Sequence, residues 1–250
     1  MPAAAPPDLQ PLESDDRWRR AGWLSIGAGA MFLLTVGYLV AVLPATGWSI
    51  DMFDDPADLL RWVDGHERIY QGLWVLYFGS QVCLLAVPTL LASLGGRAAP
   101  VFGTTAVVLA MTGLALLFAV SPVLARAHSE AALPGAAGST AQVLVLHDVT
   151  ADIGKDLRLF SELLLGVWLA STGRLLRRRS NHRRWWLLTA LGGWTFLVAA
   201  VKLFDPTNPL EDWLGFLLGT GYLVLGVGLL RPASAPARPS TTRAAGAPGS

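Results

Sequence analysis

Apolar residues fall into six long runs along the chain, separated by shorter polar segments. The runs cover residues 22–43, 69–94, 101–125, 157–176, 185–204 and 213–230. Each is close to the ~20 residues that a helix needs to cross a hydrocarbon core of ~30 Å. None alternates with the period of two that membrane strands require, and backbone amides in lipid must be satisfied within the segment. The pattern therefore predicts an all-α, polytopic membrane helix bundle with about six transmembrane helices.

Most basic and most acidic residues occupy alternate connections between these runs, with Arg61, Arg68 and Arg126 as the exceptions. The basic connections include the segments 17–20 and 174–184 together with Arg97. The acidic connections include the segments 51–67 and 148–156. Because cytosolic connections carry an excess of Lys and Arg, we expect the N-terminus and the C-terminus to be cytosolic.

Two acidic connections also carry helix signals. Asp55 and Pro56 are an N-cap and a first-turn proline, and Leu59 and Trp62 follow, which predicts a short amphipathic helix on the outer surface. In the next acidic connection, apolar residues recur at helical spacing from Leu146 onwards. The helix of the fourth span is therefore expected to begin near residue 140, well outside the bilayer.

The two ends of the chain have a different composition from the rest. Residues 1–16 are rich in Pro, Ala and acids, and residues 232–250 are rich in Pro, Ala, Ser and Gly. Such segments bury too little apolar surface to offset the entropy of ordering, so both are predicted to be disordered tails. Residues 17–231 would then form a single six-helix transmembrane domain.

Composition agrees with a membrane location. The chain is 53% hydrophobic and 15% charged, with a mean hydropathy of +0.47 and a net charge of +1. The small net charge argues against a nucleic-acid partner and leaves the lipid bilayer as the expected one. Lysine occurs only at Lys155 and Lys202 while Ala, Gly and Arg are abundant, a bias that favours a bacterial protein. We therefore expect a multi-pass protein of a bacterial plasma membrane.

Three of the four histidines lie on the predicted outer side, close to acidic residues. The set comprises His66, His128, His147, Asp148 and Asp152. Imidazole and carboxylate groups could ligate zinc there if the loops brought them together. The favoured interpretation is a solvated helix face and no cofactor, since the aspartates fall on one side of a helix.

Glu162 and Lys202 are the ionisable residues placed within the apolar zone. Charges there are expensive, so they tend to pair. The helices that carry them run antiparallel, and we predict a structural Glu162–Lys202 ion pair. Arg158, one turn from Glu162, is the competing partner.

Gly215 and Gly219 form a small-xxx-small pair in the last span. Such a pair allows two helices to approach closely. Packing within the chain is the favoured interpretation, and a homodimer through Gly215 and Gly219 is the alternative. No protein partner is indicated.

The layout resembles that of small bacterial six-helix integral membrane families of unknown function. The resemblance covers residues 18–231 and depends on an acidic connection ahead of the aromatic Tyr70, Trp74 and Tyr77, with an Arg-rich connection after the fourth span. It implies no catalytic residues, and no soluble-enzyme motif occurs. We expect a non-enzymatic role as a sensor, regulator or scaffold. The alternatives are a small-solute transporter and a membrane-embedded, metal-dependent hydrolase with its site on the outer face.

Overall fold

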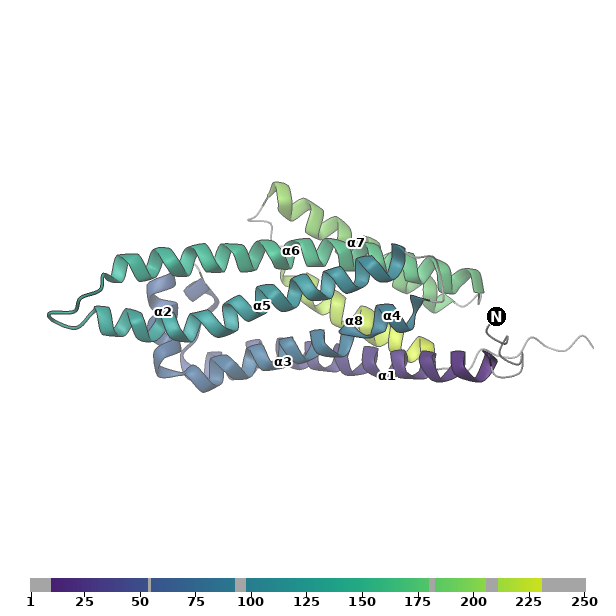
Figure 1. The fold of residues 1–250 in the computed structure, drawn as a ribbon, viewed down its shortest axis with the longest axis horizontal. Helices are drawn as coiled ribbons and strands as arrows, with labels where there is room; N and C mark the ends of the chain where they lie inside the picture. The colour runs from purple at the N-terminus through teal and green to yellow at the C-terminus, as the bar shows by residue number, and fades with distance from the viewer. Residues whose placement is uncertain (1–9, 54, 93–97, 180–182, 206–210, 231–250) are drawn as a thin grey trace, which may run out of the picture.

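The structure is a computed structural model that describes residues 10–53, 55–92, 98–179, 183–205 and 211–230. Its regular elements in these ranges are helices (Figure 1). The α-helices are α1 (Gln10–Gly37), α2 (Pro56–Gly65), α3 (Glu67–Leu85), α4 (Val87–Leu90), α5 (Ala98–Ala131), α6 (Thr140–Arg179), α7 (Arg183–Phe204) and α8 (Glu211–Leu230). A π-helical turn at Tyr38–Val42 and 3-10 turns at Pro44–Thr46 and Ile50–Phe53 connect α1 to α2.

Five of the described helices are long and apolar enough to cross a membrane, which makes this a multi-pass membrane protein. They are α1, α3 with α4, α5, α6 and α7. The apolar part described in α8, Phe216–Leu230, is shorter. The all-helical prediction is thus confirmed, whereas the sixth span and the orientation stay predictions.

The predicted tails only partly coincide with the described residues. Helix α1 already begins at Gln10, inside the segment 1–16 for which a disordered tail is expected. Residues 1–9 and the segment 232–250 lie outside the described residues.

Glycines bring the backbones of neighbouring helices into direct contact. A Cβ atom on Gly192 of α7 would lie 2.3 Å from the Ala170 nitrogen and 2.8 Å from the Gly166 oxygen on α6. A Cβ atom on Gly29 of α1 would lie 2.8 Å from the Gly219 oxygen on α8. Close backbone approach of this kind is how membrane helices gain packing energy without a hydrophobic driving force. Gly219 therefore packs within the chain, as the sequence favours; the surroundings of Gly215 are not among those described.

Helices α5 and α6 are much longer than a bilayer requires. Their 34 and 40 residues correspond to about 51 and 60 Å, against a hydrocarbon core of about 30 Å. In Figure 1 the α5–α6 hairpin extends well past the adjoining ends of α7 and α8. Helix α6 begins at Thr140, which confirms the predicted start near residue 140. Its place outside the bilayer stays a prediction.

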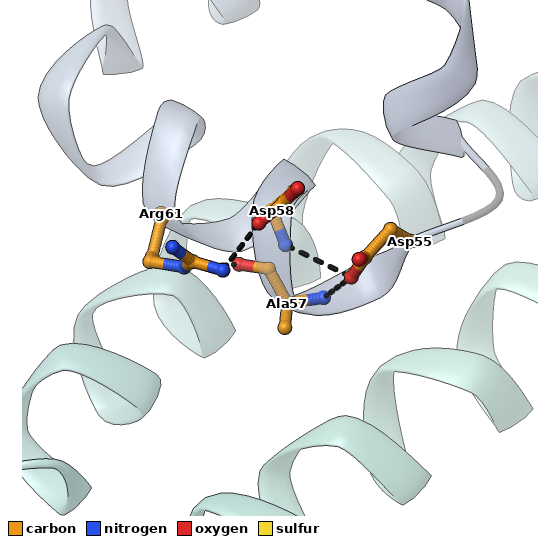
Figure 2. Close-up of polar contacts among 4 residues, drawn as sticks. All are labelled: Asp55, Ala57, Asp58 and Arg61. Carbon is orange, nitrogen blue, oxygen red and sulfur yellow. Dashed lines mark hydrogen bonds and ion pairs between the residues drawn. The ribbon is translucent and has the colours of Figure 1, made fainter.

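Helix α2 begins with the local signals that the sequence shows. The Asp55 side chain accepts hydrogen bonds from the backbone nitrogens of Ala57 and Asp58, at 3.0 and 3.2 Å (Figure 2). Arg61 pairs with Asp58 one turn later. The cap satisfies two of the backbone N–H groups that a helix N-terminus leaves without partners. Pro56 has no backbone N–H group, so it needs no partner.

The apolar face of α2 packs on protein, so it is not free to lie against lipid. Leu59, Leu60, Trp62 and Val63 are buried, and α2 contacts α5 and α6. The place of α2 on the outer surface of the membrane stays a prediction. We use the term helical lobe for residues 55–70, 120–131 and 140–156.

Polar contacts hold two segments of the helical lobe together, residues 55–70 and residues 120–131 of α5. Ser129 Oγ donates a hydrogen bond to Asp64 Oδ2 at 2.8 Å, and Arg126 forms an ion pair with Glu67. These contacts join the end of α2 and the start of α3 to the last turns of α5.

The glycine contacts lead to a test with adjacent residues. Gly192→Ala should lower the free energy of unfolding by about 1–3 kcal/mol, the usual cost of overpacking, because its Cβ would meet backbone atoms of α6. Gly193→Ala is the matched control, since nothing lies within 4 Å of its Cβ. Unfolding of the purified protein by SDS in mixed micelles would measure both. Equal stabilities of the two variants would contradict this packing.

Candidate functional site

A buried ion pair lies on α6. Arg158 Nε donates to Glu162 Oε1 at 2.9 Å, one helical turn away. The Glu162 side chain is 5% exposed and the Arg158 side chain 34%. Removing two such charges from water costs several kcal/mol, about as much as their attraction returns. An ion pair inside a membrane bundle is therefore a candidate functional feature.

The register of α6 against α7 gives the depth of this pair. Gly173 meets Thr189 and Gly166 meets Phe196, so the two helices run antiparallel at a constant offset. Continuing that offset for two more turns places Arg158 level with the last turn of α7, which ends at Phe204. The ion pair therefore lies at the junction between the transmembrane bundle and the helical lobe.

Aromatic rings from three other helices surround the pair. The Arg158 guanidinium carbon lies 5.7 Å from the centroid of the Tyr77 ring on α3. Phe32 on α1 makes edge-to-face contacts with Tyr77, at 5.0 Å between centroids, and with Tyr222 on α8, at 6.3 Å. Tyr77 and Tyr222 are buried, so α1, α3, α6 and α8 meet at this point.

Several buried polar atoms on α3 and α8 have no hydrogen-bond partner among the described residues. They include Trp74 Nε1, Gln81 Oε1 and Tyr222 Oη, all inaccessible to solvent. Trp74, Tyr77 and Gln81 fall on one face of α3, because their spacing of three and four residues matches the helical period. Each unpaired buried group costs about 1–3 kcal/mol, which a protein retains only for a reason. We call Trp74, Tyr77, Gln81, Arg158, Glu162 and Tyr222 the junction cluster.

Glu162 was expected to pair, and it does so with Arg158, the competing partner named by the sequence. The helix register keeps Lys202 at the same level as Arg158, so a Glu162–Lys202 contact stays a prediction. Residues four positions apart on one helix are neighbours on its surface, so Arg158 reaches Glu162 without any change in how α6 packs against other helices.

The outer histidines are distributed over separate parts of the helical lobe. The His66 ring stacks on Trp62 at 4.9 Å, and its Nδ1 lies 3.0 Å from the Trp62 oxygen. His128 and His147 are buried, and His147 Nδ1 lies 3.7 Å from Asp148 Oδ1. Among the described residues, no three His, Cys, Asp or Glu side chains are grouped to hold a metal ion.

Asp148 and Asp152 are exposed, as a solvated helix face requires. The zinc site thus gains no geometric support in the described part of the chain, and it stays a prediction.

Sequence reasoning did not find the junction cluster as a site. It took Tyr70, Trp74 and Tyr77 as a feature of layout and did not consider Tyr222. The usable signal was the spacing of the residues on one face of this helix.

 The four residues Tyr70, Trp74, Tyr77 and Gln81 follow one another at intervals of four, three and four, which is the spacing of a single buried helix face.

No family model, no curated protein and no solved structure matches this chain. Its function is therefore argued from its own geometry.

The ion pair leads to a test by paired substitutions. Glu162→Ala leaves the Arg158 charge without its partner, so the free energy of unfolding should fall by about 2 kcal/mol or more. The loss is below the about 3–5 kcal/mol of a fully buried pair, since Arg158 is 34% exposed. The double variant Arg158→Leu with Glu162→Leu should recover most of it. The interpretation would be contradicted if the double variant lost as much free energy of unfolding as the Arg158 and Glu162 single variants lose together. Glu67→Ala, which breaks the exposed pair with Arg126, is the control.

Proposed function

We propose that this chain is a non-enzymatic, multi-pass membrane protein with a sensory or regulatory role. The helical lobe would receive the signal, and the arginine-rich end of α6 and α7 would deliver it. The observation that carries the proposal is that α6 is a single helix of 40 residues. It contributes to the lobe at one end, carries Arg158 and Glu162 at the junction, and ends among arginines at the other.

The continuity of α6 supports mechanical coupling. An unbroken helix transmits a tilt or a shift of its first half to its second half. The backbone contacts of Gly166 and Gly173 with α7 leave no room between the two helices, so α7 would move with α6. A change in the lobe would therefore reach the far end of both helices.

The junction cluster supports a switch with discrete positions. Arg158 lies against Tyr77, so sliding α6 along α3 would separate the guanidinium from that ring. Ions and rings packed in an apolar interior favour a small number of arrangements over a continuous range. The cluster would then set the energy difference between two positions of α6.

The orientation completes the proposal. The arginine-rich segment 174–184 and both termini would face the cytosol of a bacterial cell, with α8 as the sixth span in the plasma membrane. The positive-inside rule supports this arrangement.

A distance measurement tests the coupling. Cysteines in place of Asp64 and Ser129, in a Cys83→Ala background, would be joined by a short bifunctional thiol reagent to hold α2 against α5. Ketone-bearing, spin-labelled residues in place of the exposed Arg19 and Leu187 would report the distance between α1 and α7 at the arginine-rich end. We expect the reagent to shift or narrow that distance distribution, because the lobe and α6 move together.

A monofunctional reagent on the same cysteines is the matched control. The response should shrink when Glu162→Ala is added, since the junction loses its ion pair. Identical distributions with both reagents would contradict the proposed coupling.

The unpartnered atoms Trp74 Nε1, Gln81 Oε1 and Tyr222 Oη support a second candidate, a small-solute transporter. Polar groups inside a bundle are what a solute pathway needs. Solute or proton uptake into liposomes that Tyr222→Phe abolishes would favour transport over signalling.

A further inference from the structure

Three arginines line a hollow at the last turns of α6. Arg174, Arg177 and Arg178 are exposed and enclose about 250 Å³ of surface space. Their spacing of three and four residues places them on one face of the helix. Guanidinium groups so arranged can each offer two parallel hydrogen bonds to a phosphate.

Tryptophans of α7 hold the adjoining arginines in place. The Arg177 guanidinium carbon lies 4.8 Å from the Trp186 ring centroid, and that of Arg184 lies 5.1 Å from the Trp185 ring. Trp185 is buried against α8, where a Cβ on Gly228 would lie 2.5 Å from its ring. Trp186 is 56% exposed. Exposed tryptophans at span ends favour the headgroup level of a bilayer, so Arg177 lies at that level.

Among the described side chains, none of the acidic residues forms an ion pair with Arg174, Arg177 or Arg178. The sequence contains no Asp or Glu between Glu162 and Asp205, and none after Asp212. On α1, Asp16 already pairs with Arg20 at 3.5 Å. Like charges three and four residues apart on a helix repel one another. An anion from outside the chain would remove that repulsion.

We propose that Arg174, Arg177 and Arg178 bind the phosphate of an anionic lipid headgroup. A free phosphate has the same chemistry, but the exposed Trp186 beside Arg177 favours the lipid. Trp186 and the next residue of α7, Leu187, which is 50% exposed, offer an apolar surface for an acyl chain. Basic sites between helix ends are a recurring form of lipid recognition. The proposal does not depend on the proposed sensory function.

Lipid retention tests the site. The purified protein would be titrated with dioleoylphosphatidylglycerol or dioleoylphosphatidylcholine in neutral detergent, and bound lipid counted by native mass spectrometry. Replacing Arg174, Arg177 and Arg178 together by Gln should weaken phosphatidylglycerol binding at least about tenfold, because each basic residue adds to the attraction of an anionic lipid. Phosphatidylcholine binding should not change.

The matched control replaces Arg17, Arg19 and Arg20 by Gln. These arginines precede the first span, and the change in net charge is the same. An equal loss in both variants would overturn the site, since it would show attraction by overall charge. If inorganic phosphate at the same concentration as the lipid protected the protein against thermal unfolding as well as the lipid does, the lipid would be overturned as the source of the bound phosphate.

A lysine variant guards against a folding defect. Lysine at the three positions keeps the charge but lacks the two-pronged geometry of arginine. We expect the lysine variant to bind phosphatidylglycerol more weakly than the parent and more tightly than the glutamine variant. Its melting temperature in lipid-free detergent should be unchanged. Full binding by the lysine variant would overturn the role of the guanidinium groups.

Discussion

The thickness of the bilayer is the constraint on which the structure depends. About 20 residues of helix cross a hydrocarbon core, yet α6 has 40 and α5 has 34. If the excess stayed in lipid, Asp148 and Asp152 would lie there too, so we expect it to project into water. Helix α2 covers part of the apolar surface of the hairpin with Leu59, Leu60 and Val63, while Val145 and Val149 of α6 stay exposed. The helical lobe is therefore a consequence of helix length together with charge.

Inside the bundle, packing and charge are arranged at different levels. Glycines such as Gly166, Gly192 and Gly29 bring helices into backbone contact. Such close packing stabilises the bundle, because burying larger apolar side chains gives no hydrophobic gain when the surroundings are lipid. Arg158 and Glu162 lie at the junction. Arg158 is the partner closer to the lobe, and Glu162 is the more deeply buried one. We expect the arginines of the opposite end to lie at headgroup level. Each charge would then occupy a depth at which its desolvation cost is small or is offset by a partner.

The helices and their long apolar runs could be predicted from the sequence, because backbone satisfaction in lipid leaves few alternatives. The start of α6 at Thr140 and the cap at Asp55 were predicted from spacing and from capping residues. The burial of α2 could not be, since it depends on a surface built by distant parts of α5 and α6. Nor could the meeting of Tyr77, Tyr222 and Arg158, because residues on three separate helices share no spacing in the sequence.

A depth profile of α6 tests the central claim most directly. Single spin labels at Val145, Val149, Phe160 and Val167 in liposomes would be compared for collision with oxygen, which partitions into lipid, and with a water-soluble nickel chelate. The account predicts that labels at 145 and 149 collide mainly with the nickel chelate, whereas labels at 160 and 167 collide mainly with oxygen. Oxygen-dominated collisions at 145 and 149 would place the hairpin within the bilayer and contradict the helical lobe.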